Sequence, residues 1–109
     1  MTEMLMVFTT FANEDEAARV VRVLLEERLI ACGNLLPGAR SLYAWKGAIA
    51  DQRETMALLK TRKQDWAAFM SRLHELHSYE TPQCVAVRIA AGSPGYLEWL
   101  DAALSNEGT

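Results

Sequence analysis

A long pair of strand-like segments limits the folds that this chain can adopt. Residues 31–46 and 49–62 face each other across a tight turn expected at Gly47-Ala48. The first segment has 16 residues, and at roughly 3.3 Å per residue it would span on the order of 50 Å. A compact globule of 109 residues has a radius of gyration of about 13 Å and a diameter of roughly 34 Å. The hairpin must therefore bend or project from the rest of the molecule.

The tip of this hairpin carries apolar side chains on both sides. Strand alternation places Leu42 and Ala44 on one side and Tyr43 and Trp45 on the other. An isolated two-stranded ribbon is marginal in water, so these residues predict cover by another surface, most economically a second copy of the chain. We interpret the hairpin as an arm that joins copies. The alternative is that Pro37-Gly38 divides the run into two short strands within one domain.

Composition and charge exclude several classes of protein. Half of the residues are hydrophobic and 23% are charged, as in ordinary globular domains. A net charge of -3 and a pI near 5.3 argue against nucleic-acid partners and anionic membranes. The apolar stretch at residues 4–8 is too short to span a bilayer and follows no basic segment. Cys32 and Cys84 form no C-x-x-C pair, which favours reduced thiols and a cytoplasmic location.

The rest of the chain alternates between helix and strand patterns. Residues 4–11 read as a buried strand, and Asn13 opens a helix as its N-cap with Glu16 completing a capping box. Apolar residues at helical spacing predict a second helix over about residues 64–77, and residues 82–90 read as a last strand. Ser93 and Pro94 start a final helix, and the tail from Asn106 is expected to fray.

This order of elements predicts an α+β fold. Strand, helix, strand, strand, helix and strand give the ferredoxin-like split β-α-β sandwich, here with a long central hairpin and an extra C-terminal helix. Right-handed crossovers place the first and third strands at the centre of the sheet. The other two strands become open edges, and joining unlike edges of neighbouring copies can close a ring. Cys32 and Cys84 should then lie far apart within a chain, whereas neighbouring chains can bring them together.

Two histidines and a carboxylate form the first candidate site. His74, His77 and Glu80 follow one another at intervals of three residues, and imidazole suits copper, nickel and zinc. On a helical wheel, however, His77 falls within the apolar stripe of its helix, so a packed, hydrogen-bonded histidine is the alternative to a ligand. His74 lies at the edge of that stripe and is expected at the surface.

Other candidate residues lie on the hairpin. Cys32 is a soft metal ligand, a nucleophile or a buried structural thiol, and the last is favoured because nothing in the neighbouring sequence predicts an activated thiol. Trp45 can stack on a ligand or wedge into a subunit interface, and Lys60 can neutralise an anion in a cleft between subunits. Common catalytic motifs are missing from the sequence, so no enzymatic activity is predicted. The third strand also lacks the aromatic platform of RNA recognition modules, which agrees with the absence of a nucleic-acid partner.

Five sequence blocks point to a known family. They are ACGNLLPG at 31–38, SLYAWKG at 41–47, LKT at 59–61, HSYETP at 77–82 and YLEW at 96–99. In this order and spacing, over about residues 4–104, they resemble the CutA divalent-cation tolerance proteins. The resemblance implies one CutA-like domain over residues 1–109, a homotrimer, a link to divalent ions such as Cu(II), and no established enzymatic activity. At the three positions of the metal constellation described for some members, this chain has Thr9, Leu76 and His77.

Two functions follow from these observations. The first is a homotrimeric metal-responsive protein that binds Cu(II) or another divalent ion through His77, Glu80 and Cys32. The second is a signalling or scaffold trimer resembling the nitrogen-regulatory PII proteins. It would bind a small anion or a partner protein in clefts between subunits near Trp45, Lys60 and Tyr79. Neither function involves nucleic acid or a membrane.

Overall fold

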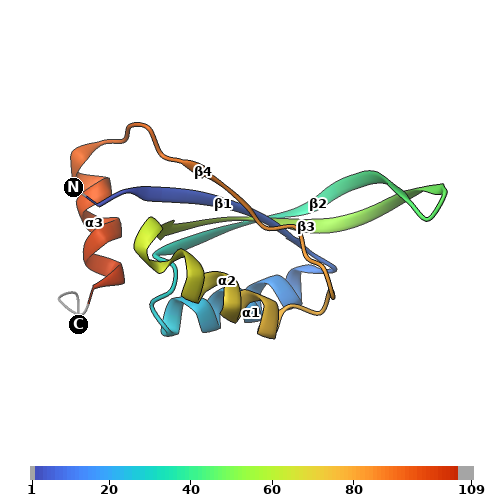
Figure 1. The fold of residues 1–109 in the computed structure, drawn as a ribbon, viewed down its shortest axis with the longest axis horizontal. Coiled ribbons are helices and arrows are strands. Elements are labelled where there is room, and N and C mark those ends of the chain that lie inside the picture. Colours follow the sequence, from blue (N-terminus) through green and yellow to red (C-terminus); the bar gives the residue numbers. More distant parts are fainter. Residues whose placement is uncertain (1, 106–109) are drawn as a thin grey trace.

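The long hairpin sets the shape of the molecule. The computed structural model describes residues 2–105, and the chain measures 48 × 26 × 23 Å along its principal axes. Strands β2 (Cys32–Trp45) and β3 (Ala48–Arg62) pair along nearly their whole length and extend well beyond the other elements (Figure 1). The prediction of a projecting arm is therefore confirmed, and the alternative of two separate short strands is wrong.

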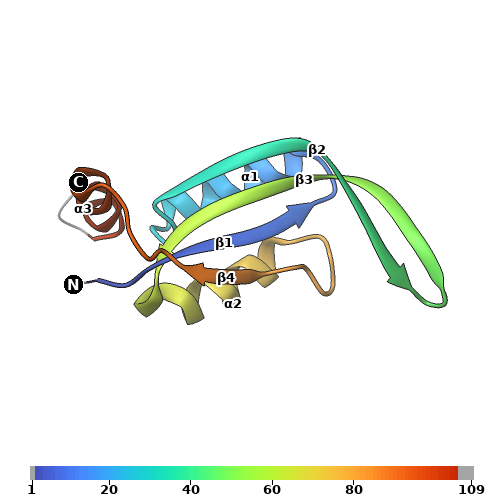
Figure 2. The ribbon, with the colours of Figure 1, turned by 90° about the horizontal axis from the view of Figure 1, so that it is seen from above.

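The sheet has the predicted strand order. Its order is β2-β3-β1-β4, with β1 (Met4–Phe11) and β3 at the centre and β4 (Val85–Arg88) at one edge (Figure 2). Each neighbouring pair is antiparallel. The edges formed by β2 and β4 have no strand partner within the described part of the chain.

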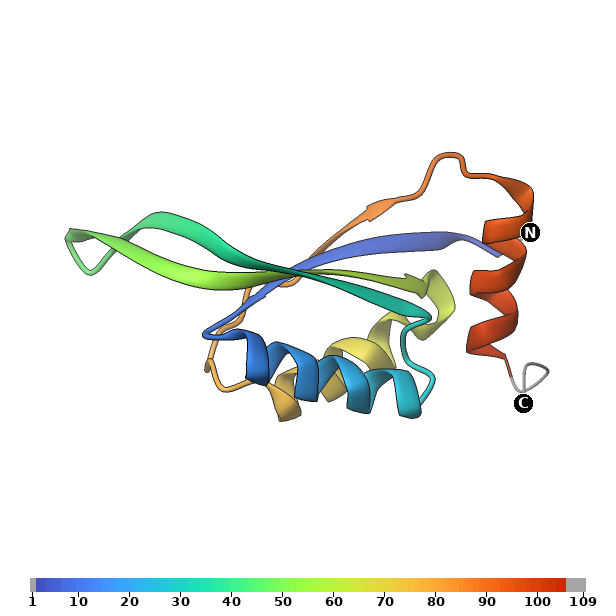
Figure 3. The ribbon, with the colours of Figure 1, turned by 180° about the vertical axis from the view of Figure 1, so that it is seen from behind.

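Two helices cover one face of this sheet. Helices α1 (Glu14–Glu26) and α2 (Trp66–Leu76) lie side by side on the same face (Figures 1 and 3). Their apolar stripes pack on the inward residues of β1 and β3 to form the main core. The opposite face carries no helix over most of its length, because α3 (Pro94–Leu104) lies across one end. These layers confirm the ferredoxin-like α+β class with an extra C-terminal helix.

The hairpin turn lies one residue earlier than predicted. Trp45 pairs with Ala48, so the turn residues are Lys46 and Gly47 rather than Gly47 and Ala48. Both have positive φ, 48° and 80°, which is the backbone of a type I′ turn. The prediction was wrong because a lysine rarely adopts this conformation. Farther down the arm, a register shift between Leu36 and Ala39 marks a bulge in β2.

Helix α1 has strong signals at both ends. Asn13 Oδ1 accepts the Glu16 amide at 2.8 Å, as predicted. The second half of the capping box does not form, because the Glu16 carboxylate instead accepts the Ser78 amide at 2.9 Å. At the other end Arg28 has a φ of 57°, and the amides of Arg28 and Leu29 donate to the carbonyls of Leu25 and Leu24 in a Schellman arrangement.

The second half of the chain departs from its predicted boundaries. A short 3-10 turn, η1 (Lys63–Asp65), precedes α2, which ends one residue before His77. Strand β4 is shorter than the expected 82–90, because only its residues opposite Leu5–Phe8 of β1 form ladder pairs. Pro82 is buried in the preceding loop and has no amide hydrogen to donate. Within residues 2–105, no helix has the length and apolar content needed to cross a membrane.

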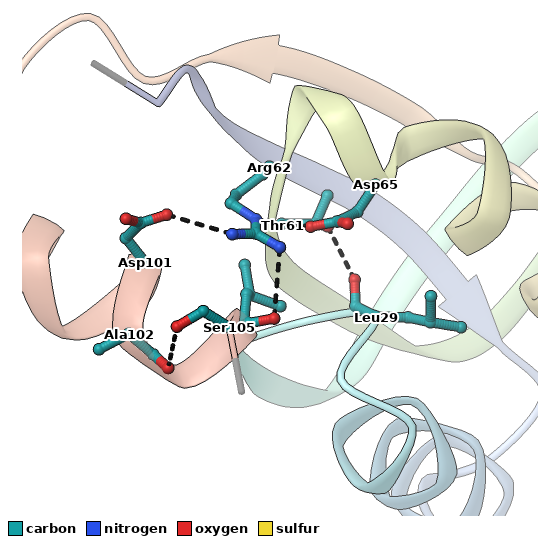
Figure 4. Close-up of polar contacts among 8 residues, drawn as sticks. Leu29, Thr61, Arg62, Asp65, Asp101, Ala102 and Ser105 are labelled. Atoms are coloured by element: carbon teal, nitrogen blue, oxygen red, sulfur yellow. Dashed lines mark hydrogen bonds and ion pairs between the residues drawn. The ribbon is translucent and has the colours of Figure 1, made fainter. Parts of the chain in front are cut away.

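Helix α3 is fixed to the sheet by a partly buried arginine. Ser93 precedes it in extended conformation without a side-chain cap bond, and Pro94 occupies its first turn. Arg62, at the end of β3, donates to Asp65 at 2.7 Å, to Asp101 at 3.3 Å and to the Leu104 carbonyl at 3.2 Å (Figure 4). The expected apolar face of α3 is only half buried, since Leu100 and Leu104 pack inward while Tyr96 and Trp99 stack on each other in the open. The predicted frayed tail lies outside the described residues.

Candidate functional site

His77 lies where α2 gives way to the loop that leads to β4. Its backbone is extended and the residue is 7% exposed. The imidazole stacks on the Phe11 ring with centroids 4.5 Å apart and an interplanar angle of 11°. Its Nε2 lies 2.7 Å from the Thr10 carbonyl oxygen, and its Nδ1 lies 3.1 Å from the Tyr79 amide nitrogen. His77 is thus the packed, hydrogen-bonded histidine that the helical wheel allows.

These contacts determine the tautomer of His77. The Tyr79 amide is a donor, so Nδ1 must accept, and the Thr10 carbonyl is an acceptor, so Nε2 must carry the proton. The neutral ring therefore uses both nitrogens inside the chain. A metal ion that binds Nδ1 has to displace the Tyr79 amide, which restrains the loop next to it.

Glu16 connects this loop to the first helix. Its carboxylate accepts the Ser78 amide, which joins the start of α1 to the residue after His77. Burial alone raises the pKa of Glu16, but the hydrogen bonds from Ser78 outweigh this and lower the pKa below its ordinary value of 4.5. The contribution of Glu16 to stability is therefore present at neutral pH and is lost as the pH falls through its folded-state pKa.

A second feature of this loop is a polar cavity beside the base of the arm. The cavity has a volume of about 490 Å³ and lies between residues of β1, the hairpin and the 77–84 loop, including Thr10, Arg40, Tyr43, Glu54, Tyr79 and Gln83. The Tyr79 hydroxyl donates to Glu54 Oε2 at 2.7 Å. Desolvation and this hydrogen bond raise the pKa of Tyr79, so the phenol stays protonated and remains a donor.

A third cluster lies at the other end of the sheet. Lys60 Nζ donates to the Tyr96 hydroxyl at 2.9 Å and lies 3.7 Å from Cys32 Sγ. The Tyr96 hydroxyl is 3.6 Å from the same sulfur. The hydrogen bond to Tyr96 raises the pKa of Lys60, so its ammonium group stays charged at neutral pH.

The three predicted metal ligands do not meet within one chain. Cys32 is in register with Lys60 and so with Met6, whereas His77 contacts Thr10, four residues and roughly 13 Å farther along β1. Glu80 is exposed in the loop after His77. Among residues 2–105, no three His, Cys, Asp or Glu side chains are grouped to hold a metal ion.

The three predicted cleft residues are also apart. Trp45 lies at the hairpin tip, is 60% exposed and pairs with Ala48. Along β3, roughly 40 Å of strand separates Ala48 from Lys60. Only Tyr79 lines the cavity described above. A cleft that contains all three must therefore combine residues of different copies.

The two cysteines lie at opposite edges of the sheet and so far apart within the chain, as predicted. Cys32 begins the edge strand β2, and Cys84 directly precedes the other edge strand, so three strand spacings of about 4.8 Å separate the edges. Both are free thiols, and burial raises the pKa of Cys84. The proximity of these thiols between copies stays a prediction.

Sequence reasoning missed Glu54 and Arg40 as cavity residues. A signal for Glu54 exists, since it alternates with Met56 and Leu58 and therefore shares their side of the strand. A carboxylate buried at a position of this kind requires a hydrogen-bond partner.

The fold, together with the residue clusters described above, defines the class of protein to which this chain belongs. This is a ferredoxin-like α+β chain with a projecting hairpin, a C-terminal helix across the sheet end and a polar loop that begins at His77. The family model described as CutA1 divalent ion tolerance protein matches residues 5–103. The chain therefore belongs to the CutA family, which is not known as a family of enzymes, in line with the prediction from sequence.

Individual relatives agree with this assignment. The chain is 41% identical over 97 residues to the divalent-cation tolerance protein CutA of Pyrococcus horikoshii, covering 89% of this chain and 94% of the relative. The crystal structure of CutA1 from Oryza sativa superimposes with a TM-score of 0.92 at 30% identity and 95% coverage of each chain. The periplasmic divalent cation tolerance protein CutA from Archaeoglobus fulgidus gives a TM-score of 0.90 at 31% identity, covering 94% of this chain and 99% of that one.

Proposed function

We propose that this chain is a homotrimeric, metal-responsive protein of the divalent-cation tolerance family and that it binds a divalent ion such as Cu(II). The observation that carries the proposal is the match of the family model to residues 5–103. The Pyrococcus horikoshii relative is also named for divalent-cation tolerance. The homotrimer and the choice of Cu(II) are the proposal's own additions to that family relation.

The proposed metal site centres on His77. Nδ1 is the atom that offers a lone pair, once the Tyr79 amide moves away. Glu80 lies three residues later in the same loop and is exposed, so its carboxylate is free to approach the same ion. Cys32 is too distant in its own chain, and we assign the thiolate to a neighbouring copy. Such a set of nitrogen, oxygen and sulfur donors suits Cu(II) or Zn²⁺.

The uncovered sheet face supports self-association. Cross-strand partners share a face, so the residues of the four strands that point away from α1 and α2 form one apolar surface: Met6, Phe8, Leu36, Met56, Leu58, Val85 and Val87. Val85 is 54% exposed and Val87 is 48% exposed. A contiguous apolar face of this kind is typical of an interface. The unlike open edges β2 and β4 fit a closed ring of copies.

Titration with Cu(II) tests the metal site. Isothermal titration calorimetry should show saturable binding by the parent protein and at least tenfold weaker binding by His77→Ala. His74→Ala is the matched control, because His74 is exposed on helix α2 and its Nδ1 lies 2.8 Å from the Met70 carbonyl oxygen of the same helix. Since His77 is buried, thermal melting must show that the variant is folded at the titration temperature. Equal affinity of the parent and folded His77→Ala would remove His77 from the site.

A second candidate function is a PII-like trimer that binds a small anion. Lys60 favours it, because this charged ammonium has no carboxylate partner among the described residues. Trp45 and Tyr79 would complete the cleft from neighbouring copies. A thermal-shift screen distinguishes the two candidates, since anionic metabolites should raise the melting temperature in this case and Cu(II) should not.

For the compartment we propose the cytoplasm. Two free thiols on opposite sides of the sheet support this choice. The Archaeoglobus fulgidus relative is named periplasmic, so family membership alone does not assign a compartment.

A further inference from the structure

A backbone bend at residues 77–79 keeps the His77 ring in one orientation. The ring stacks on Phe11, its Nε2 lies 2.7 Å from the Thr10 carbonyl oxygen, and its Nδ1 lies 3.1 Å from the Tyr79 amide nitrogen. A histidine that binds a metal ion commonly donates its other ring N–H to a carbonyl group, which fixes the tautomer and the direction of the ring. Here Nε2 has such a partner, so Nδ1 is the nitrogen left for an ion.

Glu16 reaches this bend from the start of helix α1. It lies in the first turn of the helix, 62 positions before Ser78, and is 7% exposed. Its Oε2 accepts the Ser78 amide at 2.9 Å. That amide belongs to the peptide group that joins His77 to Ser78, so the carboxylate holds the backbone directly after the imidazole. Because the apolar stripe of α1 packs in the main core, Glu16 provides a fixed point for this peptide group.

Metal binding at Nδ1 requires only the next peptide group to move. The Tyr79 amide belongs to the peptide group between Ser78 and Tyr79, and rotation about the backbone bonds on either side of it turns the N–H away from Nδ1. The preceding peptide group stays bonded to Glu16 during this rotation. His77 therefore keeps its place while Nδ1 becomes available. A ligand that is already ordered binds an ion at a lower entropy cost.

We propose that Glu16 is a positioning residue for His77: through the Ser78 amide it holds the bend, and so keeps Nδ1 in the direction from which a metal ion binds. Glu16 acts through the backbone and is not itself a metal ligand. The part of this inference that concerns the metal ion rests on the proposed function, whereas the effect of Glu16 on the order of the bend does not.

Two substitutions separate the reach of this side chain from its charge. Glu16→Gln keeps an oxygen that accepts the Ser78 amide but removes the charge, whereas Glu16→Asp keeps the charge but is one methylene group too short. In the protein without metal, NMR measurement of hydrogen exchange at the Tyr79 amide and the His77 ring N–H reports the order of the bend. We expect both protons to exchange about tenfold faster in Glu16→Asp and at the parent rate in Glu16→Gln.

Asn13→Ala is the matched control for stability. Asn13 Oδ1 accepts the Glu16 amide and caps the same end of α1, so its loss weakens the helix start without removing the Glu16 carboxylate. This variant should leave the exchange of both protons unchanged. Equal acceleration in Asn13→Ala and Glu16→Asp would show a general loosening of α1 and would contradict the proposal. If thermal melting shows that Glu16→Asp is unfolded, Glu16→Ala takes its place, because alanine also lacks the acceptor and favours a helix.

Calorimetric titration with Cu(II) tests the link to the metal site. Glu16→Asp should bind Cu(II) roughly tenfold more weakly than the parent protein, and Glu16→Gln should bind it with the parent affinity. Three results would overturn the proposal: parent exchange rates in folded Glu16→Asp, faster exchange in Glu16→Gln, or faster exchange in Glu16→Asp with unchanged Cu(II) affinity. A parent protein that does not bind Cu(II) would refute the proposed function, and the exchange rates alone would then decide whether Glu16 positions His77.

Discussion

Gly33 brings strand β2 into direct contact with helix α1. A Cβ at this position would lie 2.7 Å from Val21 Cγ1 and 3.0 Å from Leu59 Cδ2. Both neighbours belong to the main core, where packing is close to that of a solid. The requirement for glycine here arises from lack of space, since its backbone does not adopt positive φ.

Gly33→Ala should therefore destabilise the protein by about 1 to 3 kcal/mol through overpacking. Gly95→Ala is the matched control, because a Cβ there meets no atom within 4 Å and the residue lies in helix α3. Alanine in a helix is favoured over glycine, so the control should be neutral or stabilising by up to about 1 kcal/mol. Denaturant unfolding at equal protein concentration measures both. A Gly33→Ala protein as stable as the parent would contradict the packing argument.

His77 and Glu54 differ in how far their burial can be predicted from the sequence. The burial of His77 follows from the apolar positions at helical spacing before it, which are local information. The burial of Glu54 depends on Tyr79, 25 positions away, and on a loop without periodicity. No local sequence pattern encodes the contact between Glu54 and Tyr79. The cavity that these two residues line could therefore not be predicted from the sequence.

Among the elements, α3 depends on one side chain for its attachment. The Arg62 side chain is 13% exposed and bonds to Asp65 of the following turn, to Asp101 of α3 and to the carbonyl of Leu104. The Arg62 guanidinium stays positively charged, because the hydrogen bond to Asp65 raises the pKa of Arg62. Strand β3 and helix α3 are thus joined through a partly buried charge network.

Arg62→Ala should release α3 from the sheet. Asp65 and the Leu104 carbonyl lose their donor, which predicts a loss of roughly 1 to 3 kcal/mol. Hydrogen exchange should accelerate in α3 far more than in α1. Arg72→Ala is the control, because its ion pair with Glu27 lies at the surface and should change stability little. Equal acceleration in both helices would show that Arg62 supports the whole fold rather than this attachment.

Element order was predictable, whereas element ends were not. Periodicity and the Asn13 cap located α1 and the sheet order because they rest on local chemistry and handedness. The turn was misplaced by one residue because Lys46 takes a backbone conformation that its type disfavours. The last strand was predicted too long because its length depends on its pairing with β1, not on its own composition.

For the whole molecule, the uncovered sheet face determines the expected assembly. Multi-angle light scattering should give about 37 kDa, three times the chain mass of 12.2 kDa. Val87→Lys should shift the protein toward monomer, because it places a charge on the apolar face. Leu25→Lys is the matched control, since Leu25 is 40% exposed on α1, outside that face. A folded parent protein of about 12 kDa at every concentration would refute the trimer.

The tip of the arm can change in sequence without affecting the interior of the chain. Beyond Tyr43 and Gln52, no hydrogen bond or ion pair joins the hairpin to another element in residues 2–105, and Lys46 contacts its own neighbour Trp45 through a cation–π interaction. Substitutions there leave the interior of the chain untouched. Natural selection at the tip therefore acts through the molecule that the arm contacts. Variation among relatives at these few positions would show how that contact has changed during evolution.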